Sequence, residues 1–196
     1  MSLTGLLGGA FDPPHNGHLV LADDAIRHFA LERLVVVVTG DPPHKPVETD
    51  AETRFLLAGA AFAGRPLVEL SRYELDRAVP SYTVDTACWA EKAYGDAVFV
   101  VGADEFADFL SWKDPNGVLA HVRLGVATRP GYPRDALDAV LAALERPDRV
   151  ELFDIPAVPI SSSEIRDRVA RGEPVGGLVP AGVARLIAEL GLYGHR

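Results

Sequence analysis

The chain has 196 residues, 48% of them hydrophobic, and a formal net charge of −9. At roughly 150 residues per domain, this length predicts one domain with a sizeable core. The acidic balance argues against binding nucleic acid, which needs a basic face, but it does not exclude a small nucleotide. The single cysteine, Cys88, excludes a disulfide framework and suits a reducing compartment such as the cytoplasm. No apolar run approaches the ~20 residues of a membrane span, so we expect no membrane partner and no signal peptide.

Apolar runs alternate with segments of helical periodicity along the chain. In chain order, strands are predicted at 3–8, 33–38, 67–71, 97–101, 124–127 and 150–153. Helices are predicted at 17–30, 51–63, 81–94, 105–110, 134–144, 162–170 and 180–190. Strands separated by helices indicate an α/β fold, with a Rossmann-like, doubly wound parallel sheet and helices on both faces. Residues 1–196 then form a single domain, with a C-terminal helical part from about 161.

The first predicted strand leads into a glycine turn and a helix start, Gly8-Gly9-Ala10-Phe11-Asp12-Pro13-Pro14-His15-Asn16-Gly17-His18-Leu19. Such a turn presents backbone N–H groups and a helix N-terminus, where an anion can sit. His15 and His18 can add donors aimed at a phosphate. Ligands of parallel α/β sheets bind outside the carboxyl ends of strands. This stretch therefore predicts a site that holds and reacts a nucleotide phosphate.

Three other segments have the right composition to complete such a site. The loop Asp41-Pro42-Pro43-His44-Lys45-Pro46 is stiffened by three prolines, so it can hold Lys45 over a ligand; a solvated turn is the alternative. Gly102-Ala103-Asp104 follows the fourth strand. Ile160-Ser161-Ser162-Ser163-Glu164-Ile165-Arg166 has the composition of a helix start. Its hydroxyls and Arg166 make a phosphate cradle, with plain helix capping as the alternative.

Together these segments resemble bacterial nicotinate mononucleotide adenylyltransferases, members of the nucleotidylyltransferase superfamily with its H-x-G-H signature. Further matches are Pro80-Ser81-Tyr82-Thr83-Val84-Asp85-Thr86, Trp112, and the tail at Leu178-Val179-Pro180 and Gly191-Leu192-Tyr193. The chain departs from the family pattern at Ala10, at Ser163 and in a shorter loop at Thr39-Gly40-Asp41. The resemblance implies a nucleotidyltransferase-like domain that transfers an adenylyl group from ATP to nicotinate mononucleotide. The products are nicotinate adenine dinucleotide and pyrophosphate, a step of NAD biosynthesis.

The resemblance also implies a role for each residue. His18 donates to the α-phosphate in the transition state, His15 contacts the neighbouring phosphates, and Lys45 neutralises phosphate charge. Arg166, Ser161, Ser162 and Ser163 bind the β- and γ-phosphates that leave. Other ATP contacts are Gly8, Gly9, Ala10, Phe11, Gly102, Asp104 and Ile160. Nicotinate mononucleotide is bound by Tyr82, Thr83 and Trp112, with Trp112 stacked on the ring and Thr83 bonded to its carboxylate. Mg²⁺ arrives on the ATP phosphates, and no protein metal site is expected.

Several alternatives remain open on the sequence. Asp12, His15 and His18 could form a metal site. Asp104 could be a helix cap, Trp112 a core residue, and Tyr82 and Thr83 a plain helix start. Pantetheine-phosphate adenylyltransferase shares the opening motif and the serine-rich helix start, but lacks the Pro-Pro-His-Lys and Ser-Tyr-Thr segments. A nucleotide-binding sensor with inactive chemistry would have the same fold, because fold alone does not fix function. A homo-oligomer is compatible with the sequence.

Overall fold

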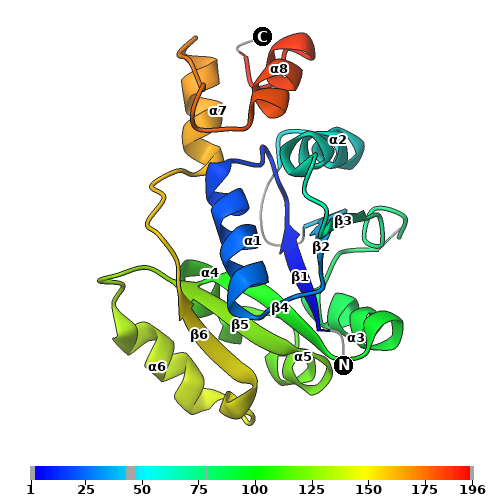
Figure 1. The fold of residues 1–196 in the computed structure, drawn as a ribbon, viewed down its shortest axis with the longest axis vertical. Coiled ribbons are helices and arrows are strands. Elements are labelled where there is room, and N and C mark those ends of the chain that lie inside the picture. The colour runs from blue at the N-terminus through cyan, green and yellow to red at the C-terminus, as the bar shows by residue number, and fades with distance from the viewer. Residues whose placement is uncertain (1–2, 43–46, 78, 195–196) are drawn as a thin grey trace.

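A parallel β-sheet runs through the centre of the protein in the computed structural model, which describes residues 3–42, 47–77 and 79–194 (Figure 1). Within these residues the sheet has six strands: β1 (Thr4–Gly9), β2 (Arg33–Val38), β3 (Val68–Ser71), β4 (Ala97–Gly102), β5 (Arg123–Thr128) and β6 (Val150–Asp154). Their order is β3-β2-β1-β4-β5-β6 and every neighbouring pair is parallel. The chain moves outward from β1 to β3, then returns to the other side of β1 at β4. This reversal creates a switch point between β1 and β4, where ligands of such sheets bind.

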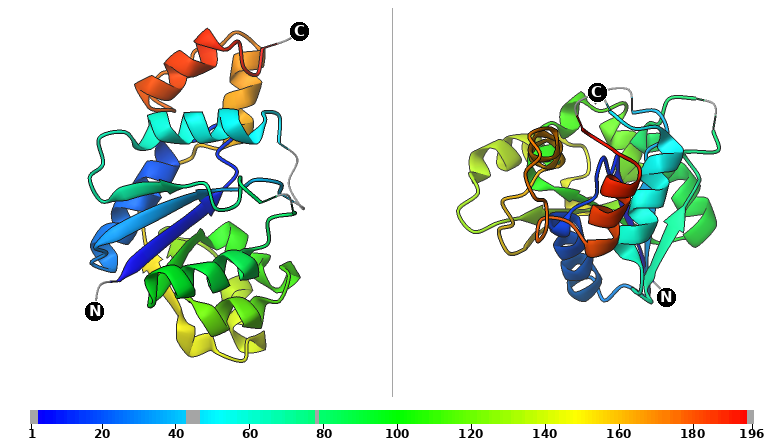
Figure 2. Two further views of the ribbon diagram at one scale, coloured as in Figure 1. Left: turned by 90° about the vertical axis from the view of Figure 1, so that its right-hand side faces the viewer. Right: turned by 90° about the horizontal axis from the view of Figure 1, so that it is seen from above.

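Helices cover both faces of the sheet, as expected. They are α1 (Asn16–His28), α2 (Ala51–Phe62), α3 (Thr83–Tyr94), α4 (Ala103–Ala107), α5 (Pro115–His121), α6 (Arg134–Ala143), α7 (Ser162–Ala170) and α8 (Ala181–Glu189), with 3₁₀ turns η1 (Phe109–Ser111) and η2 (Pro147–Arg149). Figure 2 shows α2 and α8 on one side of the sheet and α3 on the other.

Each face has its own hydrophobic core because successive side chains of a strand point to opposite faces. Leu7, Val36 and Val38 pack with α1, α2 and α8 on one face. On the other face, strand residues such as Leu6 and Val37 pack with α3, α4, α5 and α6. Strands β2, β4 and β5 are therefore almost continuously apolar, which is typical of a parallel sheet covered on both sides.

The predicted strands are confirmed to within one residue at each end, but the segment after β4 differs from the prediction. The helix expected at 105–110 is wrong: α4 starts earlier, at Ala103, and ends at Ala107, and the 3₁₀ turn η1 follows. Helix α5 was not predicted at all. Its N-cap is Asp114, whose carboxylate accepts a hydrogen bond from the Gly117 N–H at 2.9 Å, and Pro115 occupies the first helical position. Asp-Pro-x-Gly is thus a helix start here.

The last two helices lie beyond the sheet, and the segment that carries them holds the β1–α1 loop. Asn16 donates its backbone N–H to the Leu178 carbonyl (2.9 Å) and its side-chain amide to the Gly177 carbonyl (2.8 Å). The hydroxyl of Ser162 donates to the Pro13 carbonyl at 2.9 Å. The loop after β1 is therefore held in place by the C-terminal segment. None of the described helices is long and apolar enough to cross a membrane.

Candidate active site

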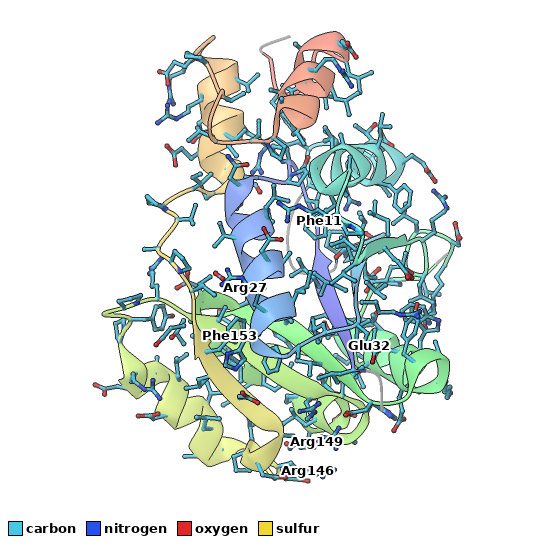
Figure 3. All side chains as sticks on the ribbon, in the orientation of Figure 1. Phe11, Arg27, Glu32, Arg146, Arg149 and Phe153 are labelled. Atoms are coloured by element: carbon cyan, nitrogen blue, oxygen red, sulfur yellow. The ribbon has the colours of Figure 1, made fainter. Side chains whose placement is uncertain are left out.

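The loop that joins β1 to α1 is built around a buried phenylalanine. Phe11 has φ = 53°, in the left-handed region that non-glycine residues rarely adopt, and it is 2% exposed. Its ring packs edge-on against Phe62 of α2 at 6.0 Å between centroids. Figure 3 labels Phe11 in the loop that follows β1. A Cβ on Gly9 would lie 3.1 Å from this ring, so the strand end must be small. The buried ring turns the backbone outward at the carboxyl end of β1.

The two histidines of the motif lie ring against ring at the start of α1, with their planes tilted by 34°. His15 is the N-cap, and its backbone N–H donates to Nδ1 of His18 at 3.1 Å. The ring centroids are 3.8 Å apart, and the His18 ring also packs on Phe11 at 5.1 Å. A Cβ on Gly17 would lie 2.9 Å from Nδ1 of His15, which explains the glycine between the histidines. Because Nδ1 of His18 is an acceptor, the neutral ring carries its proton on Nε2.

Asp12 is buried, 3% exposed, and serves as a structural acceptor. One carboxylate oxygen accepts from the Glu48 N–H (2.6 Å), and the other accepts from the hydroxyls of Thr49 and Tyr193, both at 2.7 Å. Burial and the hydrogen bond to Asp12 raise the pKa of Tyr193 well above its ordinary value. In the described part of the chain, no three His, Cys, Asp or Glu side chains are grouped to hold a metal ion. The metal-site alternative for Asp12, His15 and His18 is therefore not supported.

Arg54 of α2 was not singled out by the sequence analysis, yet it joins two loops, one after β1 and one between β2 and α2. Its guanidinium is 1% exposed and donates to the carbonyls of Ala10 (3.0 Å), Thr39 (2.5 Å), Gly40 (2.8 Å) and Thr49 (3.2 Å). Desolvation lowers the pKa of Arg54. The side chain thus fixes the β1–α1 loop relative to the loop after β2.

The serine-rich helix start lies beside the histidine loop. Ser161 is the N-cap of α7 and accepts from the Glu164 N–H at 3.1 Å, so the capping alternative is correct for this hydroxyl. Arg166 donates to the Asp12 carbonyl (2.8 Å) and to the Ser163 hydroxyl (3.3 Å), and it pairs with Glu48 at 2.8 Å. Ile160 packs against the core. The basic side chain and the α7 N-terminus therefore face the same loop as His15.

Two clefts flank the β1–α1 loop. The first, of about 380 Å³, lies between the end of β1 and the segments around α3 and η1; it is lined by Gly8, Gly9, Ala10, Thr39, Pro42, Glu74, Ser81, Tyr82, Thr83, Phe99, Glu105, Asp108, Ser111, Trp112 and Lys113. The second, of about 120 Å³, lies beyond β4; it is lined by Gly17, Gly102, Ala103, Asp104, Ala127, Thr128, Arg129, Tyr132 and residues 155–158. The two clefts separate the predicted acceptor residues from the predicted ribose residues.

The residues expected to bind the pyridine ring all line the first cleft. Tyr82 is the N-cap of α3 and Thr83 is its first residue. Both residues therefore also start a helix, which was the alternative interpretation of this segment. Trp112 is partly buried, and its ring packs edge-on against Phe109 at 5.2 Å. It therefore contacts the core and lines the cleft at once. Lys45 lies outside the described residues.

The residues expected to bind ribose line the second cleft. Gly102 is the N-cap of α4, so the helix-cap alternative for Asp104 is wrong. Asp104 lies in the first turn of α4 and lines the second cleft together with Tyr132. Burial and this carboxylate raise the pKa of Tyr132.

Two charged residues in the first cleft were missed by the sequence analysis. Glu74 is 7% exposed, and its Oε1 accepts from the Thr86 hydroxyl at 2.6 Å. Burial raises its pKa, although the nearby Thr86, Ser81, Gly40 and Arg77 act in the opposite direction. Lys113 follows Trp112, and its Nζ lies 4.0 Å from the ring centroid of Tyr82.

Comparison with known proteins agrees with this geometry. A switch point with two histidines, a serine-rich helix start and two flanking clefts suits a nucleotidyltransferase, and the names of the chain's relatives give this same class. Residues 6–168 match the family model described as Cytidylyltransferase-like, and the chain belongs to that family.

The relatives and the solved structures agree with each other. A protein of Moorella thermoacetica is 42% identical, with 98% of this chain and 92% of the relative covered. One of Salinispora arenicola is 44% identical, with 95% and 99% covered. Both carry the name "Probable nicotinate-nucleotide adenylyltransferase". The fold is similar to that of Plasmodium falciparum nicotinic acid mononucleotide adenylyltransferase complexed with NaAD, with a TM-score of 0.81, 18% identity and 98% of each chain covered.

Proposed function

We propose that this protein is a nicotinate-nucleotide adenylyltransferase, which transfers the adenylyl group of ATP to nicotinate mononucleotide in NAD biosynthesis. The observation that carries this conclusion is the pair of clefts on either side of the β1–α1 loop. A reaction that joins two nucleotides needs two nucleoside sites whose phosphates meet at one point. The loop with His15 and His18 occupies that point.

The chemistry follows from the charges of the reactants. A phosphate oxygen of the mononucleotide attacks the α-phosphorus of ATP, a new O–P bond forms, and the bond to the β-phosphate oxygen breaks to release pyrophosphate. The nucleophile is already an anion, so no general base is required. The protein must align the anions and stabilise the charge that develops on the α-phosphoryl group.

Each part of the site has a task in this reaction. His18 donates from Nε2 to the α-phosphate, in the tautomer that the His15 N–H imposes. Arg166 and the N-terminus of α7 bind the departing β- and γ-phosphates. Gly102 and Asp104 hold the ribose in the second cleft, while Thr83 and Trp112 hold the pyridine ring in the first. Lys45 adds a positive charge to the phosphates.

We further propose that Mg²⁺ reaches the site bound to ATP. It supplies charge neutralisation on the triphosphate when bound, and it prefers oxygen ligands such as phosphates. The carboxylate of Asp12, in the same loop as His15, is already engaged by protein hydrogen bonds on both oxygens, which supports the phosphates as the main Mg²⁺ ligands. We place the protein in the cytoplasm, since its lone Cys88 suits a reducing compartment.

Measuring pyrophosphate release from ATP and Mg²⁺ with three acceptors tests this function. Nicotinate mononucleotide should give rapid release and nicotinate adenine dinucleotide as the product. Phosphopantetheine should give none, in keeping with the relatives' names. Release with phosphopantetheine alone would favour the pantetheine-phosphate alternative. Nucleotide binding without release for any acceptor would favour the sensor.

A further inference from the structure

We propose that Lys113 is the residue that makes the protein prefer an acceptor with a ring carboxylate over one with a neutral amide. The proposal rests on the proposed function and concerns the first cleft. Among the described residues that line this cleft, three are acidic (Glu74, Glu105 and Asp108) and Lys113 is the one basic side chain. An acceptor that carries an anionic ring must be compensated there by a cation.

The geometry around Lys113 fits a carboxylate on a stacked ring. Its Nζ lies 4.0 Å from the centroid of the Tyr82 ring, a cation–π distance that holds the ammonium over α3's N-cap. The indole of Trp112, one residue earlier, lines the same cleft and is fixed edge-on by Phe109 at 5.2 Å. A pyridine ring stacked on this indole therefore has an ammonium group and the Thr83 hydroxyl beside it.

Thr83 and the helix N-terminus do not by themselves decide between acid and amide. A hydroxyl and N–H groups can donate to both oxygens of a carboxylate but only to the single oxygen of an amide, so they favour the acid by the loss of one acceptor. A full positive charge distinguishes the two, because a charge-assisted hydrogen bond is about twice as strong as a neutral one. In a cleft with three acidic residues, removing this charge leaves the carboxylate facing like charges.

The decisive experiment compares three variants in steady-state kinetics with nicotinate mononucleotide and nicotinamide mononucleotide. Lys113→Met removes the charge and keeps much of the length, and Lys113→Arg keeps the charge. Lys92→Met is the matched control, because Lys92 lies exposed in the last turn of α3 and causes the same change of net charge. Calorimetric Kd values for both mononucleotides cover the case in which the amide is not turned over.

We expect Lys113→Met to lower kcat/KM for the nicotinate form about tenfold or more, mainly through KM. The value for the nicotinamide form should change less than about twofold, and KM for ATP should not change. Lys113→Arg should restore most of the preference, and Lys92→Met should match wild type. The KM for the nicotinate form should rise with salt in wild type and much less in Lys113→Met.

The inference would be overturned if Lys113→Met lowered kcat/KM equally for both acceptors. It would also be overturned if this variant preferred the nicotinate form as strongly as wild type does. Failure of the wild-type protein to release pyrophosphate with either acceptor would instead refute the proposed function. The two failures are thus distinguishable in one set of assays.

Discussion

The main-chain N–H of His15 donates a hydrogen bond to Nδ1 of His18 at 3.1 Å, which fixes the His18 tautomer with its proton on Nε2. We expect His18→Ala to lower kcat by about 10²–10³, the usual cost of one transition-state donor. His18→Gln places an amide N–H near the Nε2 position and should retain more activity than His18→Asn, which cannot reach it. Single-turnover rates and ATP affinity measure the effect. Near-normal kcat in His18→Ala, with ATP binding intact, would refute the assigned role.

In the proposed reaction, Arg166 and the N-terminus of α7 bind the leaving pyrophosphate. Arg166→Ala should weaken ATP binding more than AMP binding, because only the triphosphate reaches the α7 cradle. Arg168→Ala is the control on the same helix, since Arg168 pairs with Glu164 at 2.9 Å instead of facing Asp12. It should leave both affinities unchanged. Calorimetric Kd values decide, and equal losses for ATP and AMP would contradict the cradle.

Arg54→Met should destabilise the protein as well as impair catalysis. The substitution leaves the buried carbonyls of Ala10, Thr39 and Gly40 without their donor. We expect a loss of at least about 3 kcal/mol in the free energy of unfolding. Arg185→Met, at a side chain 70% exposed, should cost no more than about 0.5 kcal/mol. Urea titrations of both variants measure the difference, and similar losses would show that Arg54 has no special role.

The buried carboxyl of Glu74 predicts a pH dependence of stability. Burial raises its folded-state pKa above the ordinary value of 4.5, so in the window above 4.5 the folded state binds more protons than the unfolded state. The stability that this group contributes is complete at low pH and is lost as pH rises through the raised pKa. Glu74→Gln cannot ionise and still accepts from Thr86. Its free energy of unfolding relative to wild type should therefore increase with pH, and urea titrations from pH 4.5 to 8 test this. A constant difference would refute the burial effect.

Thr83 and Trp112 should separate into two kinetic classes. Trp112→Ala should weaken both mononucleotides alike, by about 1–3 kcal/mol, because stacking does not sense the ring substituent. Thr83→Val should narrow the wild-type preference for the nicotinate form, which we expect to be at least about tenfold in kcat/KM. Kinetics with both acceptors measure each effect. A Trp112→Ala variant that changes selectivity would show that the indole does more than stack.

The strands and the motif loop were predictable because their signals are local. Apolar runs such as 33–38 and 97–102 directly predict buried parallel strands, and the glycine turn after β1 indicates a helix start. Helix α5 was missed although Asp114 and Pro115 form a recognisable start, because the dipeptide also suits a bend. Arg54 could not have been found this way. An arginine on an amphipathic helix is normally exposed, and the burial of Arg54 depends on carbonyls from two separate loops.

The sequence likewise could not predict how the charged residues of the first cleft are placed. Tyr82, Thr83 and Trp112 were named through a family resemblance, but the position of Lys113 over the Tyr82 ring depends on how η1 packs beside α3. Glu74 lies after β3, in a segment whose sequence gives no sign of burial. Both residues needed the tertiary structure.

The hydrogen bond between Tyr193 and Asp12 joins residues 181 positions apart. During synthesis on the ribosome, the motif emerges first, yet its buried carboxylate acquires this partner only after residue 193 has been translated. The contacts of Arg166 with the Asp12 carbonyl and of Asn16 with the Gly177 carbonyl arrive almost as late. A nascent chain that has already formed β1 and α1 therefore lacks a finished phosphate loop. Assembly of the site therefore waits for the segment from Arg166 to Tyr193, which adds the last of these contacts.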